Sequence, residues 1–164
     1  MSLAIRVARP DDADTIHALV VGLAAYERVP DGVRVTPGVL RQQLASTRPP
    51  FECLLAEEDG AARGFALFYQ TYSTWRGRPG AWLEDLFVLE EHRGRGIGGA
   101  LLRQLAQIAV ERDYARLEWA VLDWNAPALA FYRSLGAEPL DEWTTQRLSD
   151  GPLHALAAGV RAAP

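Results

Sequence analysis

The chain has 164 residues, 49% apolar and 23% charged, the composition of a globular domain large enough to bury a core without metals or disulfides. Its formal net charge of −4 argues against a general binder of nucleic acid or of anionic membranes. Cys53 is the only cysteine, which excludes an intramolecular disulfide, and we expect its side chain to be a small buried apolar group.

No segment approaches the roughly 18 apolar residues that span a bilayer, and residues 1–8 have no apolar stretch of the signal-peptide type. We therefore expect a cytoplasmic protein without a membrane, nucleic-acid or metal partner. We expect a single domain over residues 1–164, with its core over about 3–150 and a peripheral tail over 151–164.

The first part of the chain combines one strand with two helices. Residues 3–8 alternate as a short strand, and a helix then starts after Pro10, with apolar residues recurring at helical spacing through Leu23. A second helix is expected from Thr36, whose side chain suits the N-cap, to Leu44.

Three strand-like runs follow, and they form the middle of the expected sheet. These runs cover residues 53–57, 64–71 and 82–89, and Asp59-Gly60 predicts a hairpin between the first two. From Gly98 the apolar residues recur with a helical period.

The last part of the chain adds a strand over 117–122, a helix over 126–135 that ends at Gly136, and a final strand over 143–148. The order is therefore β-α-α-β-β-β-α-β-α-β. Consecutive strands imply antiparallel pairs, and a helix between two strands implies at least one parallel crossover. The sequence predicts an α/β fold with a mixed sheet flanked by helices.

The turn before the helix at Gly98 is rich in glycine and arginine, and reads Arg93-Gly94-Arg95-Gly96-Ile97-Gly98-Gly99. A helix start presents unpaired N–H groups and the positive end of the helix dipole. Glycines let a diphosphate approach the backbone, and the two arginines add positive charge. The run is also consistent with a glycine-rich turn that carries two solvated arginines.

Two other nucleotide motifs do not fit this turn. Gly94, Gly96 and Gly99 match the dinucleotide fingerprint, but the next strand has no acid at the ribose-binding position, and this is not the first βαβ unit of a doubly wound fold. The Gly-Lys-Ser/Thr sequence of a Walker loop is absent.

The pattern Arg93-x-x-Gly96-x-Gly98 resembles the acetyl-CoA signature of the GNAT superfamily of N-acetyltransferases, Gln/Arg-x-x-Gly-x-Gly/Ala. The resemblance implies a GNAT-like acyl-CoA N-acyltransferase fold, with a mostly antiparallel sheet splayed at the fourth strand, and acetyl-CoA as the cofactor. In that family the strand before the turn splays at a bulge, and its backbone pairs with the pantetheine arm. By resemblance, this role falls to Leu86, Phe87 and Val88.

Glu84 and Asp85 are adjacent acids in an otherwise apolar strand. Because side chains alternate across a strand, we expect the two carboxylates on opposite faces. A carboxylate on a covered face must be paired or hydrogen-bonded, so at least one needs a cation or a water-lined cleft. An ion pair with a nearby arginine would also satisfy this requirement.

The expected chemistry favours a functional role for this pair. Only about one alkyl amine in a thousand is neutral at pH 7, and attack on a thioester needs a base that reaches the amine directly or through water. The run Leu83-Glu84-Asp85 resembles that of polyamine-type acetyltransferases. The resemblance implies that Glu84 is the base and that Asp85 holds the amine.

Asn125 and Tyr132 form a second element with a family counterpart. Asn125 suits the N-cap of the helix at 126–135, and Tyr132 follows on that helix, where a tyrosine is usually part of the core. The same Asn-x₆-Tyr spacing recurs in GNAT enzymes. There the asparagine contacts the cofactor arm and the tyrosine donates a proton to the leaving thiolate, so the resemblance assigns these roles here.

The resemblance extends from residue 6 to residue 148 and is strongest for the thialysine N-epsilon-acetyltransferase branch of the diamine acetyltransferases. It places Trp75, and the pair Tyr26-Glu27 at the end of the first helix, in the amine pocket. For Tyr26 and Glu27, an ordinary surface position without a role in binding is an open alternative. Polyamine-specific members carry an aspartate near Ser73, which argues against spermidine or spermine. The branch forms homodimers.

These observations predict an acetyl-CoA-dependent N-acetyltransferase that acts on a small primary amine, with a thialysine-like or diamine substrate favoured, by direct attack in a ternary complex. Two alternatives remain open: a related enzyme for another amine, such as a polyamine, a drug or a peptide N-terminus, and a non-catalytic acyl-CoA-binding sensor. The presence of both Glu84 and Tyr132 speaks against the sensor.

Overall fold

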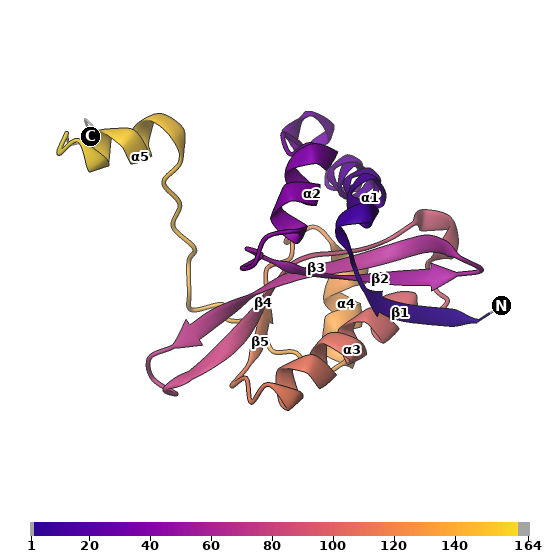
Figure 1. Ribbon diagram of the computed structural model, residues 1–164. Coiled ribbons are helices and arrows are strands. Elements are labelled where there is room, and N and C mark those ends of the chain that lie inside the picture. Colours follow the sequence, from indigo (N-terminus) through magenta and orange to yellow (C-terminus); the bar gives the residue numbers. More distant parts are fainter. Residues whose placement is uncertain (1, 161–164) are drawn as a thin grey trace. The chain divides into compact units, whose positions relative to one another are not determined.

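Figure 1 shows a computed structural model, which describes residues 2–160. The chain divides into two compact units, Met1–Ala120 and Val121–Pro164. The first unit contains the five strands of the sheet, which are β1 Leu3–Val7, β2 Glu52–Glu58, β3 Ala61–Ser73, β4 Arg78–Val88 and β5 Leu117–Trp119.

The strands lie in the order β1-β2-β3-β4-β5. The first four pair antiparallel, while β4 and β5 pair parallel, as expected from the helix that connects them. The predicted fold class, a mixed and mostly antiparallel sheet flanked by helices, is therefore confirmed.

The helices of the first unit cover both faces of this sheet. They are α1 Ala13–Tyr26, α2 Pro37–Leu44 and α3 Ile97–Glu111, with the short 3-10 helices η1 Pro10–Asp12, η2 Pro30–Gly32 and η3 Glu90–His92. Figure 1 shows α1 and α2 over one face and α3 over the other. The predicted N-cap of α2 is confirmed, since Thr36 Oγ1 accepts a hydrogen bond from Val39 N at 3.3 Å.

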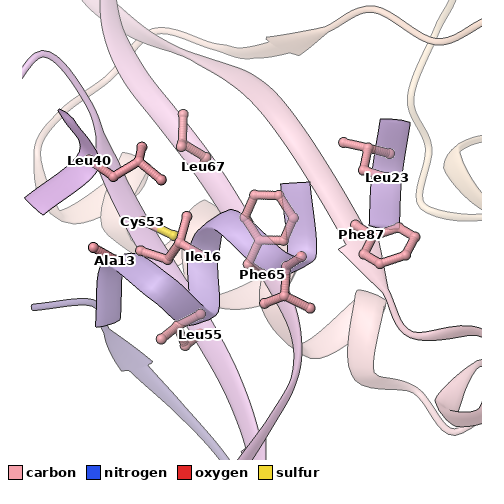
Figure 2. Packing of buried hydrophobic residues seen from close by; sticks show 10 residues of the cluster. Ala13, Ile16, Leu23, Leu40, Cys53, Leu55, Phe65, Leu67 and Phe87 are labelled. Carbon is pink, nitrogen blue, oxygen red and sulfur yellow. The ribbon is translucent and has the colours of Figure 1, made fainter. Parts of the chain in front are cut away.

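One hydrophobic cluster joins α1 and α2 to their face of the sheet (Figure 2). Ile16 of α1 packs there with Phe65 and Leu67 of β3. Cys53 belongs to the same cluster and is buried as expected, and burial raises the pKa of its thiol to about 12.

The second unit differs from the sequence prediction at its C-terminal side. The predicted helix is present as α4 Ala126–Ser134, and Gly136 follows it with a left-handed φ of 84°. However, residues 143–148 form no strand, and a further helix, α5 Asp150–Ala157, lies where a peripheral tail was expected. Residues 161–164 of that tail lie outside the described residues.

The prediction of a final strand failed because a strand needs a hydrogen-bonded neighbour. Trp143 and Leu148 are apolar, but both are exposed, so this segment buries little apolar area. The predicted strand at 117–122 is shorter for a related reason, because its pairing with β4 covers only residues 117–119. Among residues 2–160, no helix is long and apolar enough to cross a bilayer.

Candidate active site

A β-bulge in β4 determines where the two adjacent carboxylates lie. Leu67 pairs with Asp85 and Phe68 pairs with Leu83, so Glu84 is an extra residue in β4 without a partner in β3. A bulge of this kind interrupts the alternation of side chains between the two faces of a sheet.

Because of this bulge, Glu84 and Asp85 lie on the same face of the sheet. Asp85 is the cross-strand partner of Leu67, which belongs to the cluster under α1. Trp82 is the partner of Tyr69, two residues along from Leu67, and therefore lies on that face as well. Trp82 Nε1 donates a hydrogen bond to Glu84 Oε2 at 3.0 Å. The expectation of opposite faces, based on strict alternation, is therefore wrong.

The side chains around Glu84 fix its carboxylate beside the aromatic pair Tyr69 and Trp82. Burial, the negative charge of Glu84 and a hydrogen bond with Glu84 raise the pKa of Tyr69. Glu84 is exposed to solvent, so its carboxylate is held in place without being desolvated. A carboxylate of this kind is accessible to a substrate amine.

Asp85 is more enclosed than Glu84. Burial raises its pKa to about 6, and the charges of Glu84 and then Glu27 add to the shift. At pH 7 the Asp85 carboxylate is therefore mostly ionised. The charges of Glu84 and Glu27 thus both act on Asp85. Across the described residues, no group of three or more His, Cys, Asp or Glu side chains is placed so that it could hold a metal ion.

Glu27 and Tyr26 reach this region because α1 ends there. Arg28 has a left-handed φ of 66°, and Val29 N donates to Ala24 O at 2.9 Å, the pattern of a Schellman motif. Glu27 is the C-cap residue of α1, and burial raises its pKa.

Helix α1 and strand β4 lie close together at Gly22. A Cβ on Gly22 would meet Phe87 Cε1 at 3.0 Å, so a larger side chain would hold the helix away from the strand. The end of α1 thus lies near β4: the charge of Glu27 acts on Asp85, and Tyr26 packs against the cluster that contains Phe87. Their role as substrate contacts stays a prediction.

The predicted cofactor strand has an unpaired edge. β4 pairs with β5 only over residues 81–83, so within the described part of the chain residues 85–88 pair with β3 alone. An unpaired strand edge can pair with another extended chain, although Val88 O in this segment already accepts a hydrogen bond from Arg93 Nε at 3.0 Å. The Phe87 side chain itself is part of the core.

The glycine-rich turn follows this edge and leads into α3. Gly94 and Gly96 have left-handed φ values of 73° and 81°, which glycine adopts without strain. Gly96 is the N-cap of α3, and the first helical hydrogen bond runs from Ala100 N to Gly96 O at 2.9 Å. The N–H groups of residues 97–99 consequently have no partner within the helix.

The backbone of this turn leaves room for a ligand. Nothing lies within 4 Å of the position that a Cβ would take at Gly94, Gly96 or Gly99. An open backbone with N–H groups at a helix N-terminus is the arrangement that binds phosphate groups. The residues present therefore fit the diphosphate of coenzyme A.

The two arginines of the turn have partners within the protein. Arg93 Nε donates to Val88 O at 3.0 Å, and its guanidinium lies 4.4 Å from the centroid of the Tyr26 ring. Arg95 Nη2 pairs with Glu58 Oε1 at 2.9 Å. Both side chains link the turn to other elements of the first unit.

Trp75 lies apart from the other predicted substrate contacts. It is in the turn between β3 and β4 and is 91% exposed. The strand ladder continues from Phe68 to Ser73 before this turn, a distance of roughly 17 Å at about 3.4 Å per residue. Within one chain, Trp75 is therefore not part of the group around Glu84.

Asn125 and Tyr132 belong to the second unit. Asn125 Oδ1 accepts a hydrogen bond from Ala128 N at 3.3 Å, so its predicted role as N-cap of α4 is confirmed. Tyr132 lies on the same helix with its ring 5.4 Å from that of Phe131. Both side chains are thus positioned by α4.

The sequence analysis missed three residues that support the candidate site: Glu58, Tyr69 and Trp82. The hydrogen bond from Trp82 to Glu84 could not be predicted, because it depends on the bulge in β4 and the sequence does not show that bulge. Glu58 and Arg95 are 37 residues apart, and no local pattern links them.

Comparison with known proteins identifies relatives along most of the chain. The model of the acetyltransferase (GNAT) family matches residues 17–137. A thialysine N-epsilon-acetyltransferase of Bos taurus is 35% identical over 164 residues, covering 93% of this chain and 96% of that protein. An L-ornithine N5-acetyltransferase of Arabidopsis thaliana is 29% identical, covering 93% of this chain and 86% of that protein.

Solved structures share the fold as well. An integron cassette protein from the mobile metagenome of V. cholerae has a TM-score of 0.81 at 27% sequence identity, covering 96% of this chain and 98% of that one. The fold of this chain is therefore shared with a solved structure over nearly the whole length of both.

Proposed function

Because this chain belongs to the acetyltransferase (GNAT) family, we propose that it transfers an acetyl group from acetyl-CoA to the primary amine of a small lysine-like or diamine substrate. The coarser conclusion, that the protein is an N-acetyltransferase, follows directly from the family and from its named relatives.

The observation that carries the proposal is the arrangement of residues 81–99 in the first unit. The bulge at Glu84 brings two carboxylates to one face, the strand edge beyond them is unpaired, and the open glycine turn follows directly. An amine site, a site for an extended acyl carrier and an anion site thus succeed one another along one segment.

The turn and the strand edge supply the proposed coenzyme site. The N–H groups of residues 97–99 bind the diphosphate, and the backbone of Leu86, Phe87 and Val88 pairs with the pantetheine arm. Acetyl-CoA, when bound, supplies the thioester carbonyl that the amine attacks. A backbone N–H near Val88 stabilises the negative charge that develops on that carbonyl oxygen.

The carboxylates bind the amine and remove its proton. An alkylammonium ion has a pKa near about 10.4, so at neutral pH it must lose a proton before it can attack. Glu84 is the proposed base, because its carboxylate is accessible and fixed by Trp82. Asp85, together with Glu27, attracts and orients the ammonium ion.

Two residues of α4 have roles that rest on the family resemblance. Tyr132 donates a proton to the leaving thiolate, whose pKa near about 8.5 makes an acid useful. Asn125 contacts the cofactor arm.

The substrate class rests on two supports. Relatives that span more than nine-tenths of this chain and most of their own length include proteins named for thialysine and ornithine, which both carry a terminal primary amine. Ser73 is buried, and its hydroxyl accepts a hydrogen bond from Arg76 N at 3.2 Å, so it offers no negative charge to a second ammonium ion. A lysine-like acceptor is therefore favoured over a longer polyamine.

The test combines coenzyme binding with an amine panel. Calorimetry should detect binding of coenzyme A, and thiol release should be fastest with thialysine, lysine or ornithine and slower with spermidine. Glu84→Gln should lower kcat about 10²- to 10⁴-fold and leave coenzyme affinity unchanged. Glu111→Gln, an exposed acid on α3, is the matched control.

Two outcomes would contradict the proposal. One is a folded protein without affinity for coenzyme A or its acyl esters. The other is wild-type thiol release by the double variant Glu84→Gln with Tyr132→Phe.

A further inference from the structure

A buried carboxylate lies beneath the glycine-rich turn. Glu58, the last residue of β2, is 7% exposed, although it directly precedes the Asp59-Gly60 turn. Its Oε1 lies 2.9 Å from Arg95 Nη2, and its Oε2 lies 3.4 Å from His92 Nδ1. Arg95 Nη1 also lies 2.8 Å from His92 Nδ1, so the three side chains form one cluster.

Arg95 is the only side chain between two glycines of the turn. Gly94 and Gly96 both have positive φ, and nothing lies within 4 Å of either Cβ position. Neither glycine can therefore anchor the turn by packing, and free glycines have more conformational freedom than any other residue. The contact of Arg95 with Glu58 connects this part of the turn to β2.

We propose that the Glu58–Arg95 ion pair positions the diphosphate-binding turn, and that Arg95 assists coenzyme binding through Glu58 and not by contacting a phosphate. This inference rests on the proposed function, since it assumes that the turn binds coenzyme A. Glu58 and Arg95 are positioning residues in this assignment.

The burial of Glu58 is the reason for this assignment. If Arg95 turned outward to a phosphate, the Glu58 carboxylate would keep only the longer contact with His92, and a buried carboxylate that loses its hydrogen-bonded cation is strongly unfavourable. The backbone N–H groups of residues 97–99 need no such movement, because the helix start already presents them. A turn that is fixed before binding loses less conformational entropy when the coenzyme binds.

The chain supplies a matched control at the other end of the same elements. Glu52, the first residue of β2, pairs with Arg112 at the C-terminal end of α3, with Oε1 and Nη1 2.5 Å apart. The two ion pairs thus connect β2 with opposite ends of α3. Only the Glu58 pair adjoins the glycine-rich turn.

The experiment measures coenzyme A binding by calorimetry for Glu58→Gln, Arg95→Gln, the double variant and Glu52→Gln. We expect each single variant at the Glu58–Arg95 pair to bind about tenfold more weakly, because the turn is no longer fixed. The double variant should bind no more weakly than either single variant, since both remove the same interaction. Glu52→Gln should bind as the wild type does.

Steady-state kinetics provides a second readout. The KM for acetyl-CoA should rise in the same three variants, while kcat and the KM for the amine stay unchanged, which a general loss of structure would not produce. Arg95→Gln leaves the buried Glu58 carboxylate without its cation, whereas the double variant has no carboxylate in the pair. Thermal unfolding of both shows whether a loss of folding contributes.

A direct contact between Arg95 and a phosphate would give a different pattern of coenzyme affinities. A direct phosphate contact by Arg95 predicts that Glu58→Gln releases the guanidinium and leaves coenzyme affinity unchanged or tighter, while Arg95→Gln alone weakens it. That outcome would overturn the inference and leave the proposed function intact. Failure of the wild-type protein to bind coenzyme A would overturn the proposed function instead.

Discussion

Glu84 and Asp85 are neighbours in β4, but their surroundings give them different properties. Glu84 is exposed and accepts a hydrogen bond from the Trp82 indole, while Asp85 is enclosed and faces the charges of Glu84 and Glu27. Environment therefore separates two chemically similar groups into an exposed carboxylate and an enclosed one whose pKa is raised.

The raised pKa of Asp85 implies a cost in stability. Its pKa is about 6 in the folded protein, against an ordinary value of 3.8 for an aspartate side chain. Between these values the folded protein binds more protons than the unfolded chain, so the free energy of unfolding decreases as pH rises. The full cost is present above about pH 6 and absent below the unfolded value.

Asp85→Asn should consequently stabilise the protein at pH 7.5. We expect an increase in the free energy of unfolding on the order of 2 kcal/mol there, and little difference near pH 4. Urea unfolding at the two pH values measures it, with the exposed Asp11→Asn as control. The same variant should have a higher KM for the amine. An Asp85→Asn protein that is less stable than the wild type at pH 7.5 contradicts this account.

Among the elements, β4 was predicted at nearly the right residues, but two of its side chains were wrongly predicted to lie on opposite faces. The apolar run predicted a strand over residues 82–89, and β4 covers Arg78–Val88. The opposite-face placement of Glu84 and Asp85 followed from strict alternation, and the bulge at Glu84 overturned it. A bulge depends on the partner strand, and so is absent from the pattern of one strand.

Helix α3 offers a way to separate backbone strain from ligand binding. Gly96 has a φ of 81°, so Gly96→Ala should destabilise the fold by about 1–2 kcal/mol. Gly99 lies inside the helix, so Gly99→Ala should leave stability unchanged or raise it by up to about 1 kcal/mol.

Coenzyme binding should nevertheless weaken in both of these glycine variants. At Gly99 the added methyl group enters the open space over the first turn of α3, where a diphosphate approaches the backbone. Thermal unfolding and calorimetry on the same samples make the comparison. If Gly99→Ala binds coenzyme A as tightly as the wild type, the diphosphate does not lie over this turn.

At the scale of the whole molecule, the family and the compact units divide the chain differently. The structure has the units Met1–Ala120 and Val121–Pro164, whereas the family model matches residues 17–137 and so crosses that boundary. We propose that the two units work as a single acetyltransferase domain, because the roles assigned to Glu84 and Tyr132 belong to one reaction.

A single domain should unfold in one cooperative transition. Differential scanning calorimetry should give a calorimetric enthalpy equal to the van't Hoff enthalpy. Coenzyme A at about 100 times its Kd should stabilise the whole transition by about 2.7 kcal/mol. Two separate transitions, of which the ligand shifts only one, would show that the units are independent.

The features that could be predicted from the amino-acid sequence are local ones. The apolar periods located the main strands and helices, Thr36 and Asn125 identified two helix starts, and the glycine turn indicated the family. Each of these depends on side chains a few residues apart, whose spacing follows from the geometry of one helix, strand or turn.

Features that join distant segments are visible only in the folded protein. These are the common face of Glu84 and Asp85, the pairing of Glu58 with Arg95, and the absence of a strand at residues 143–148. Strand register, buried ion pairs and strand pairing all require a partner elsewhere in the chain. Their free energy comes from contacts that form only when the chain folds, so a local pattern cannot specify them.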